Sequence, residues 1–132
     1  MYHAVVANNT CARTDGFIAE GLQHGKVAKP AFMPVAFVEH LDNTIAEGNN
    51  YGGGVGGFTL SGFYNASSVD YTGAMATAIT YRGNTADNGF WTVEGAVEDV
   101  LIEGNTMVDS DAGLVMKGNQ TFRVFTRNNV GL

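Results

Sequence analysis

VLIEGNTM, at residues 100–107, is the stretch that decides the fold, because similar stretches recur along the chain. Three are close copies: AVVANNTC at 4–11, ITYRGNTA at 79–86 and RVFTRNNV at 123–130; a fourth, VEHLDNTI at 38–45, is weaker. In each, a short stretch with alternating apolar positions precedes asparagine, and such alternation is typical of a β-strand. The chain therefore repeats a unit in which a strand runs into an asparagine turn.

A second short strand follows each of the first four copies and ends in glycine. The four are FIAEG at 17–21, FTLSG at 58–62, WTVEG at 91–95 and LVMKG at 114–118. Each repeat is therefore a strand, an asparagine turn, a second strand and a glycine turn.

The spacing of the repeats indicates a solenoid. Asn84 and Asn105 are 21 residues apart, Asn105 and Asn128 are 23 apart, and the two earlier spacings are 34 and 41. A period of about 22 residues fits one coil of a parallel β-solenoid, in which each strand stacks on the same strand of the next coil. Leucine-rich repeats are excluded because their leucine spacing is absent, and the frequent glycine and asparagine disfavour helical repeats. We expect an all-β solenoid of four to five coils, with residues 1–132 as one domain or as a fragment of a longer solenoid.

Equivalent residues of the coils should stack in columns, and one column is asparagine. Its members are Asn9, Asn43, Asn84, Asn105 and Asn128. Asparagine tolerates the left-handed conformation of a sharp corner, and its amide can bond to the matching asparagine of the next coil. We expect a structural ladder of asparagines. Asn49 is an alternative for the second coil, but only Asn43 keeps the asparagine-threonine-apolar order.

Two columns of the second strand are wholly apolar and should fill the interior. One contains Phe17, Phe58, Trp91 and Leu114, and the other contains Ala19, Leu60, Val93 and Met116. Stacked like residues are the normal core of such a coil. His40 takes an inward position in its strand, which favours a core histidine over a catalytic base.

Two coils carry extra residues at the same place, after the second strand. The extra segments are roughly residues 22–37 and 63–77, so two long loops should emerge side by side from one corner. Loops on a rigid scaffold commonly carry function, which makes Tyr64 and Tyr71 candidate ligand-binding residues. Alternatively, the loops cover an apolar face or the end of the coil.

The stretch 100–106, followed by AGLVM at 112–116, resembles the repeat of right-handed parallel β-helix proteins. This group includes pectate-lyase-like enzymes, alginate epimerases and phage tailspikes. The resemblance covers most of residues 4–132 and implies a right-handed coil that binds or processes polysaccharide along an outer strand face. The Asp-Pro-His triplet of the epimerases is missing, because neither Pro30 nor Pro34 follows an aspartate. Catalytic residues stay unassigned, and any activity would be of the polysaccharide lyase, hydrolase or epimerase type.

Four charged residues should lie on the outer face as two cross-coil pairs. Arg82 should neighbour Glu103, and Glu94 should neighbour Lys117. A groove for acidic sugars needs such a row of cations and carboxylates, so these four are candidate substrate-binding residues. The alternative is a set of solvated ion pairs that contribute little to stability.

Four aspartates lie in the turns between the two strands: Asp15, Asp87, Asp109 and Asp111. Stacked turns could bring these carboxylates together, and Ca²⁺ takes several oxygen ligands at one centre. The sequence therefore offers a candidate calcium site. Solvated turn residues are the alternative, since no Asp-x-Asp-x-Asp-Gly loop is present.

Charge and hydropathy limit the classes of partner that this chain could bind. The net charge of −6 disfavours a nucleic-acid binder, which needs clustered cations. The sequence contains no run of about 18 apolar residues, so it predicts no membrane span, and no signal peptide is visible. The sequence therefore leaves the compartment unknown.

The ends of the repeat array carry no visible polar cap. Uncapped solenoid ends expose backbone groups and core residues. A non-catalytic module that self-associates through its coil ends is therefore the alternative to a polysaccharide-binding protein.

Overall fold

The structure, a computed structural model, describes residues 3–12, 16–24, 31–33, 35–46, 57–63, 76–87, 90–95, 97–108, 114–117 and 121–131. These residues form three sheets. The first sheet contains β1 (Ala4–Ala7), β5 (Val35–Leu41), β8 (Ala76–Arg82), β11 (Val97–Glu103) and β14 (Thr121–Arg127), in that spatial order. The second contains β2 (Thr10–Ala12), β6 (Thr44–Ala46), β9 (Thr85–Asp87) and β12 (Thr106–Val108). The third contains β4 (Ala31–Met33), β3 (Gly16–His24), β7 (Gly57–Phe63), β10 (Phe90–Gly95) and β13 (Leu114–Lys117).

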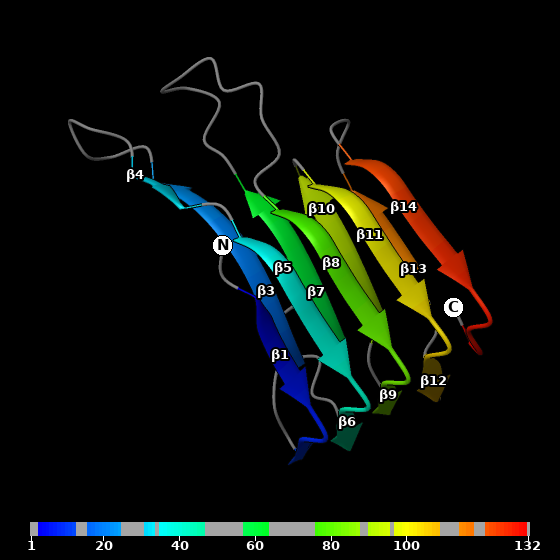
Figure 1. Cartoon of the computed structure of the whole chain (residues 1–132). Helices are drawn as coiled ribbons and strands as arrows, with labels where there is room; N and C mark the ends of the chain where they lie inside the picture. The colour runs from blue at the N-terminus through cyan, green and yellow to red at the C-terminus, as the bar shows by residue number, and fades with distance from the viewer. Residues whose placement is uncertain are drawn as a thin grey trace.

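The predicted parallel β-helix of four to five coils is confirmed. All pairings in the first two sheets are parallel, and each strand pairs with the equivalent strand of the next coil. In Figure 1 the first sheet lies in front with its strands running down, and the third sheet lies behind with its strands running up. Successive coils are displaced to the right in this view, so the coil is right-handed.

The third sheet has the register that the glycine-ended strands predict. Phe58 of β7 pairs with Phe17 of β3 and with Trp91 of β10, and Trp91 pairs with Leu114 of β13. The side chains of this sheet, apart from Met116, lie outside the described residues. Met116 is 61% exposed although its column is expected to be interior. Its strand is the edge strand of the sheet, so no described strand covers that side.

The first long insertion is not wholly a loop, which corrects the expectation for residues 22–37. β3 runs on to His24, and β4 returns antiparallel to it, with Leu22 opposite Met33 and His24 opposite Ala31. β4 therefore covers part of the outer edge of β3, at the end of the coil, where the alternative interpretation of this insertion places it. The second insertion lies mostly outside the described residues.

The buried hydrophobic side chains that the structure describes belong to the first two sheets. The largest fully buried ones include Ile79, Tyr81, Ile102 and Ile45. These residues belong to inward columns, because successive side chains of a strand point to opposite faces. Each fully buried aliphatic side chain contributes about 1.5–3 kcal/mol.

An asparagine ladder runs along the corner between these sheets. Oδ1 of Asn43 accepts from Nδ2 of Asn9 at 2.9 Å, and Oδ1 of Asn84 accepts from Nδ2 of Asn43 at 3.1 Å. The same contact joins Asn84 to Asn105 at 3.0 Å and Asn105 to Asn129 at 3.0 Å. Asn43, Asn84 and Asn105 are fully buried. The choice of Asn43 over Asn49 is confirmed, but the last member is Asn129, so the prediction of Asn128 is wrong.

The left-handed conformation belongs to the residue before each ladder asparagine, not to the asparagine itself. These residues have φ from 52° to 67° and are Asn8, Asp42, Gly83, Gly104 and Asn128. Asn128 is thus the corner residue of the last coil, and the second asparagine of the pair enters the ladder. The division is physical: a corner needs a residue that tolerates positive φ, and the ladder needs a buried amide.

A second column of left-handed residues bends the strands of the first sheet. It contains Phe37, Ala78, Asp99 and Arg123, with φ from 52° to 57°. None of these residue types favours the conformation as glycine does. The stacked backbone of neighbouring coils therefore imposes the left-handed conformation, and the repeat pattern of the sequence does not predict it.

The corner column yields a stability prediction at Gly83. Gly83→Ala should destabilise the fold by about 1–2 kcal/mol, because its φ is +67° and a Cβ there would meet the carboxylate of Asp42. Gly104→Asn is the matched control: it has open space around the Cβ position, and asparagine already occupies the same corner at Asn8 and Asn128. Urea unfolding should show the larger loss for Gly83→Ala. If both variants lost the same amount of stability, the left-handed conformation and the nearby Asp42 carboxylate would not be what disfavours alanine at Gly83.

Candidate functional site

The outer face of the first sheet presents three columns of side chains across the coils. The column nearest the asparagine corner contains Ala7, Leu41, Arg82, Glu103 and Arg127. The middle column contains Val5, Glu39, Thr80, Leu101 and Phe125, and the third contains Phe37, Ala78, Asp99 and Arg123. Three of the four arginines of the chain lie on this face.

Two arginines share one glutamate across three coils. Nε of Arg82 lies 3.2 Å from Oε2 of Glu103, and Nε of Arg127 lies 2.8 Å from Oε1 of the same carboxylate. The hydrogen bond from Arg127, followed by the charges of both arginines, holds the pKa of Glu103 below its usual range. The arginine side chains are 54% and 61% exposed, so this row carries one net positive charge at the surface. The predicted Arg82–Glu103 pair is confirmed as a contact.

Arg123 forms a second charged cluster on the same face. It donates from Nε to Asp99 at 2.6 Å and from Nη2 to Glu98 at 2.9 Å. The bond to Asp99 raises the pKa of the guanidinium and lowers that of the aspartate. Two carboxylates outweigh one arginine here, so this cluster repels anions where the Arg82–Glu103–Arg127 row attracts them.

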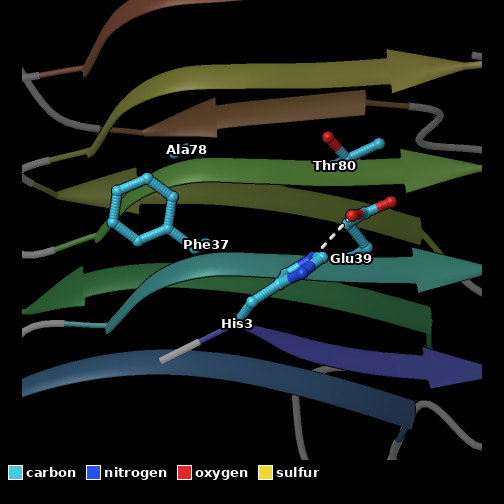
Figure 2. Close-up of a pocket in the computed structure, with 5 residues that line it drawn as sticks. All are labelled: His3, Phe37, Glu39, Ala78 and Thr80. Carbon is cyan, nitrogen blue, oxygen red and sulfur yellow. Dashed lines mark hydrogen bonds and ion pairs between the residues drawn. The ribbon is translucent and has the colours of Figure 1, made fainter. Parts of the chain in front are cut away.

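A shallow depression of about 280 Å³ lies over the first coils of this face. Figure 2 shows its lining: the ring of Phe37 beside Ala78, and Glu39 beside Thr80, with His3 bonded to Glu39. Nε2 of His3 lies 2.5 Å from Oε1 of Glu39. Phe37 is 40% exposed, because its left-handed backbone turns the ring outward. The depression thus combines an exposed aromatic ring with a carboxylate, an imidazole and a hydroxyl group.

Two other predicted site residues, Glu94 and Lys117, belong to a different sheet from Arg82 and Glu103. Glu94 and Lys117 are register partners in the third sheet, on the opposite side of the coil from Arg82 and Glu103. Their side chains, like Tyr64 and Tyr71, lie outside the described residues. The two predicted charged pairs therefore belong to different surfaces.

The predicted calcium ligands are largely outside the described residues as well. Asp87 ends β9, whereas Asp15, Asp109 and Asp111 are not described. Within the described ranges, no three His, Cys, Asp or Glu side chains are grouped so that they could hold a metal ion. The calcium site stays a prediction from the sequence.

His40 is a core residue, as its inward position predicts. It is 3% exposed, and its ring stacks on Tyr81 with a centroid distance of 4.8 Å and an interplanar angle of 11°. Burial lowers the pKa of His40 to about 4, because the charged ring would lose its hydration. At neutral pH the ring is therefore an uncharged part of the interior.

Arg127 is the functional candidate that the sequence interpretation misses. Placing Asn128 in the ladder sets Arg127 opposite Gly104, whereas the actual register sets it opposite Glu103. An error of one residue in a strand moves every side chain to the other face. The signal that could have corrected it is the Asn8–Asn9 pair of the first copy, whose second asparagine takes the ladder position as Asn129 does.

The fold and this face together define the class of the molecule: it is a parallel β-solenoid with a buried asparagine ladder and a charged, aromatic outer strand face. Comparison with known proteins adds no family, since no family matches the sequence and neither a curated protein nor a solved structure matches the chain. Over the described ranges, the structure contains no helix long and apolar enough to cross a membrane.

Proposed function

We propose that the outer face of the first sheet binds an acidic polysaccharide. The observation that supports this proposal is the neighbourhood of the Phe37 depression and the Arg82–Glu103–Arg127 row on one continuous strand face. Five stacked strands about 4.8 Å apart give a platform about 19 Å long, which suits an extended chain of several sugar units.

The Phe37 depression and the Arg82–Glu103–Arg127 row would have different roles in binding. An exposed aromatic ring can pack on the apolar face of a sugar ring, as Phe37 is placed to do. Arginine forks match the carboxylate of a uronate, and Arg82 and Arg127, which contact Glu103 through Nε, are both more than half exposed. The net charge of −6 disfavours binding of an anion to the molecule as a whole. The positive charge of this row favours an anionic ligand locally.

Binding is tested with soluble polygalacturonate and alginate, with a neutral glucan as reference and with calcium either added or chelated. We expect the acidic polymers to bind in both calcium conditions, more weakly at high salt. Arg82→Ala should weaken binding about tenfold, which corresponds to about 1.4 kcal/mol. Phe37→Ala should also weaken it, and alanine already occupies the same left-handed position at Ala78. Isothermal titration calorimetry measures both variants.

Val108→Thr is the matched control, because Val108 is exposed on the second sheet, away from this face. It should bind as the unchanged protein does. Binding to none of the polymers would overturn the proposal. Binding that requires calcium and is unaffected by Arg82→Ala would instead assign recognition to the aspartates.

A further inference from the structure

We propose that this chain stacks head to tail on further copies of itself, so that the asparagine ladder and the first sheet continue from one copy into the next. The surfaces involved are the first-coil surface, made by β1, β2 and β3, and the last-coil surface, made by β13, β14 and Asn129. The inference does not depend on the proposed polysaccharide binding.

The ladder has a direction, and its two ends are complementary. In each inner step, the backbone N–H and Nδ2 of one asparagine donate to Oδ1 of the asparagine in the next coil. The backbone N–H of the corner residue likewise donates to the strand carbonyl of the next coil, as Gly104 does to Arg127. At the last-coil surface Asn128 and Asn129 therefore present N–H donors. At the first-coil surface Ala7 O and Asn9 Oδ1 are the matching acceptors.

One contact at the first-coil surface differs from the rest of the ladder. Nδ2 of Asn43, Asn84, Asn105 and Asn129 each donates to a strand carbonyl of the preceding coil, such as His40 O for Asn84 at 2.8 Å. Nδ2 of Asn9 donates instead to Ala7 O of its own coil at 3.1 Å. A stacked copy would supply the carbonyl of Thr126 at the usual position and release Ala7 O for the corner N–H of Asn128.

The strand edges fit the same arrangement. β14 and β1 are the two edge strands of the first sheet, and both run in the same direction. In the third sheet, β13 is level with residues 17–20 of β3, whereas β4 covers β3 only from Leu22 to His24. β4 therefore leaves open the part of β3 that β13 of a second copy would pair with.

Apolar side chains gather at the two surfaces that would meet. Phe125 and Met116, each 61% exposed, and Val130, 63% exposed, lie at the last-coil surface, and Val5, 54% exposed, lies at the first. The column register places Phe125 against Val5 of the next copy. Because the two surfaces are different, the contact is heterologous and propagates into an open-ended filament instead of closing as a dimer.

Ala7 provides a charge test of the register. In the stack it would lie beside Arg127, at the end of the Arg82–Glu103–Arg127 row. Ala7→Glu should strengthen association about fivefold by extending the row, and Ala7→Lys should weaken it about fivefold by repelling Arg127. Both variants change the same position, so their difference reports the sign of the charge. Sedimentation velocity over a range of protein concentrations measures the association.

We expect a series of species that grows with concentration, and loss of this series in Phe125→Lys. Mixing Phe125→Lys with Val5→Lys should yield a discrete dimer, because each variant retains one working surface. Circular dichroism confirms that the variants fold. A monomer at all concentrations, growth that stops at a dimer of the unchanged chain, or equal effects of the two Ala7 variants would each overturn the proposal.

Discussion

Asn84→Ala should destabilise the protein by about 4 kcal/mol, the largest effect we expect from a single substitution. Oδ1 of Asn84 accepts from the backbone N–H and Nδ2 of Asn43, and its own Nδ2 donates to His40 O and to Asn105 Oδ1. Removing the amide leaves several buried polar groups without these bonds, and each such group costs about 1–3 kcal/mol. Since domains of this size are stable by only about 5–15 kcal/mol, the variant should unfold at much lower urea concentration.

Asn9→Ala is the matched control at the exposed end of the same ladder. Asn9 makes the same kind of contact with Asn43, but its side chain is exposed, so water can replace the lost bonds. We expect a loss of about 1 kcal/mol or less. If the two variants were equally stable in urea unfolding, the buried ladder would not be a main source of stability.

Acidification from pH 6.5 to pH 4 should cost about 3 kcal/mol of stability through His40. Burial lowers the pKa of this histidine from 6.5 to about 4 in the folded protein. Between these values the unfolded chain binds a proton on the ring and the folded chain does not, so stability falls as the pH falls. Each unit of pKa difference corresponds to about 1.36 kcal/mol, and the lowered pKa values of Asp99 and Glu103 act mainly at lower pH.

His40→Phe should flatten this part of the pH profile, because phenylalanine keeps a ring against Tyr81 and cannot be protonated. His3→Ala is the control: His3 is exposed, and the variant should keep the acid slope. Urea unfolding at several pH values from 4 to 7 measures both. A His40→Phe profile parallel to that of the unchanged protein would show that other groups cause the acid sensitivity.

The stacking of equivalent residues in columns explains how much of the fold can be predicted from the sequence. A parallel solenoid places equivalent residues side by side, so similarity between VLIEGNTM and ITYRGNTA translates directly into contact between their strands. The same rule predicts the Arg82–Glu103 contact before any coordinates are known. It fails in the last coil, where Asn128 and Asn129 both suit an asparagine column and one of them serves as the left-handed corner.

Other features are hidden because they depend on neighbours instead of on local pattern. Ala31–Met33 pairs with β3 although it is too short to show strand periodicity, and its position follows from the exposed edge of β3. Phe37 reaches the outer depression through a left-handed backbone that the stacked coils impose on an unfavourable residue type. Arg127 is missed because the register predicted for its coil is displaced by one residue from the register in the structure.

The unequal coil lengths have a practical consequence. Ladder asparagines are separated by 34, 41, 21 and 24 residues, yet consecutive members make the same amide contact at 2.9–3.1 Å. The second coil is longer at two places: residues 47–56 separate β6 from β7, where residues 88–89 separate β9 from β10, and residues 64–75 separate β7 from β8, where residue 96 separates β10 from β11. The corner between the third sheet and the first therefore absorbs part of the length difference. Foreign peptides could be grafted at this corner, one per coil at intervals of about 4.8 Å, to present an ordered array of epitopes on a rigid support.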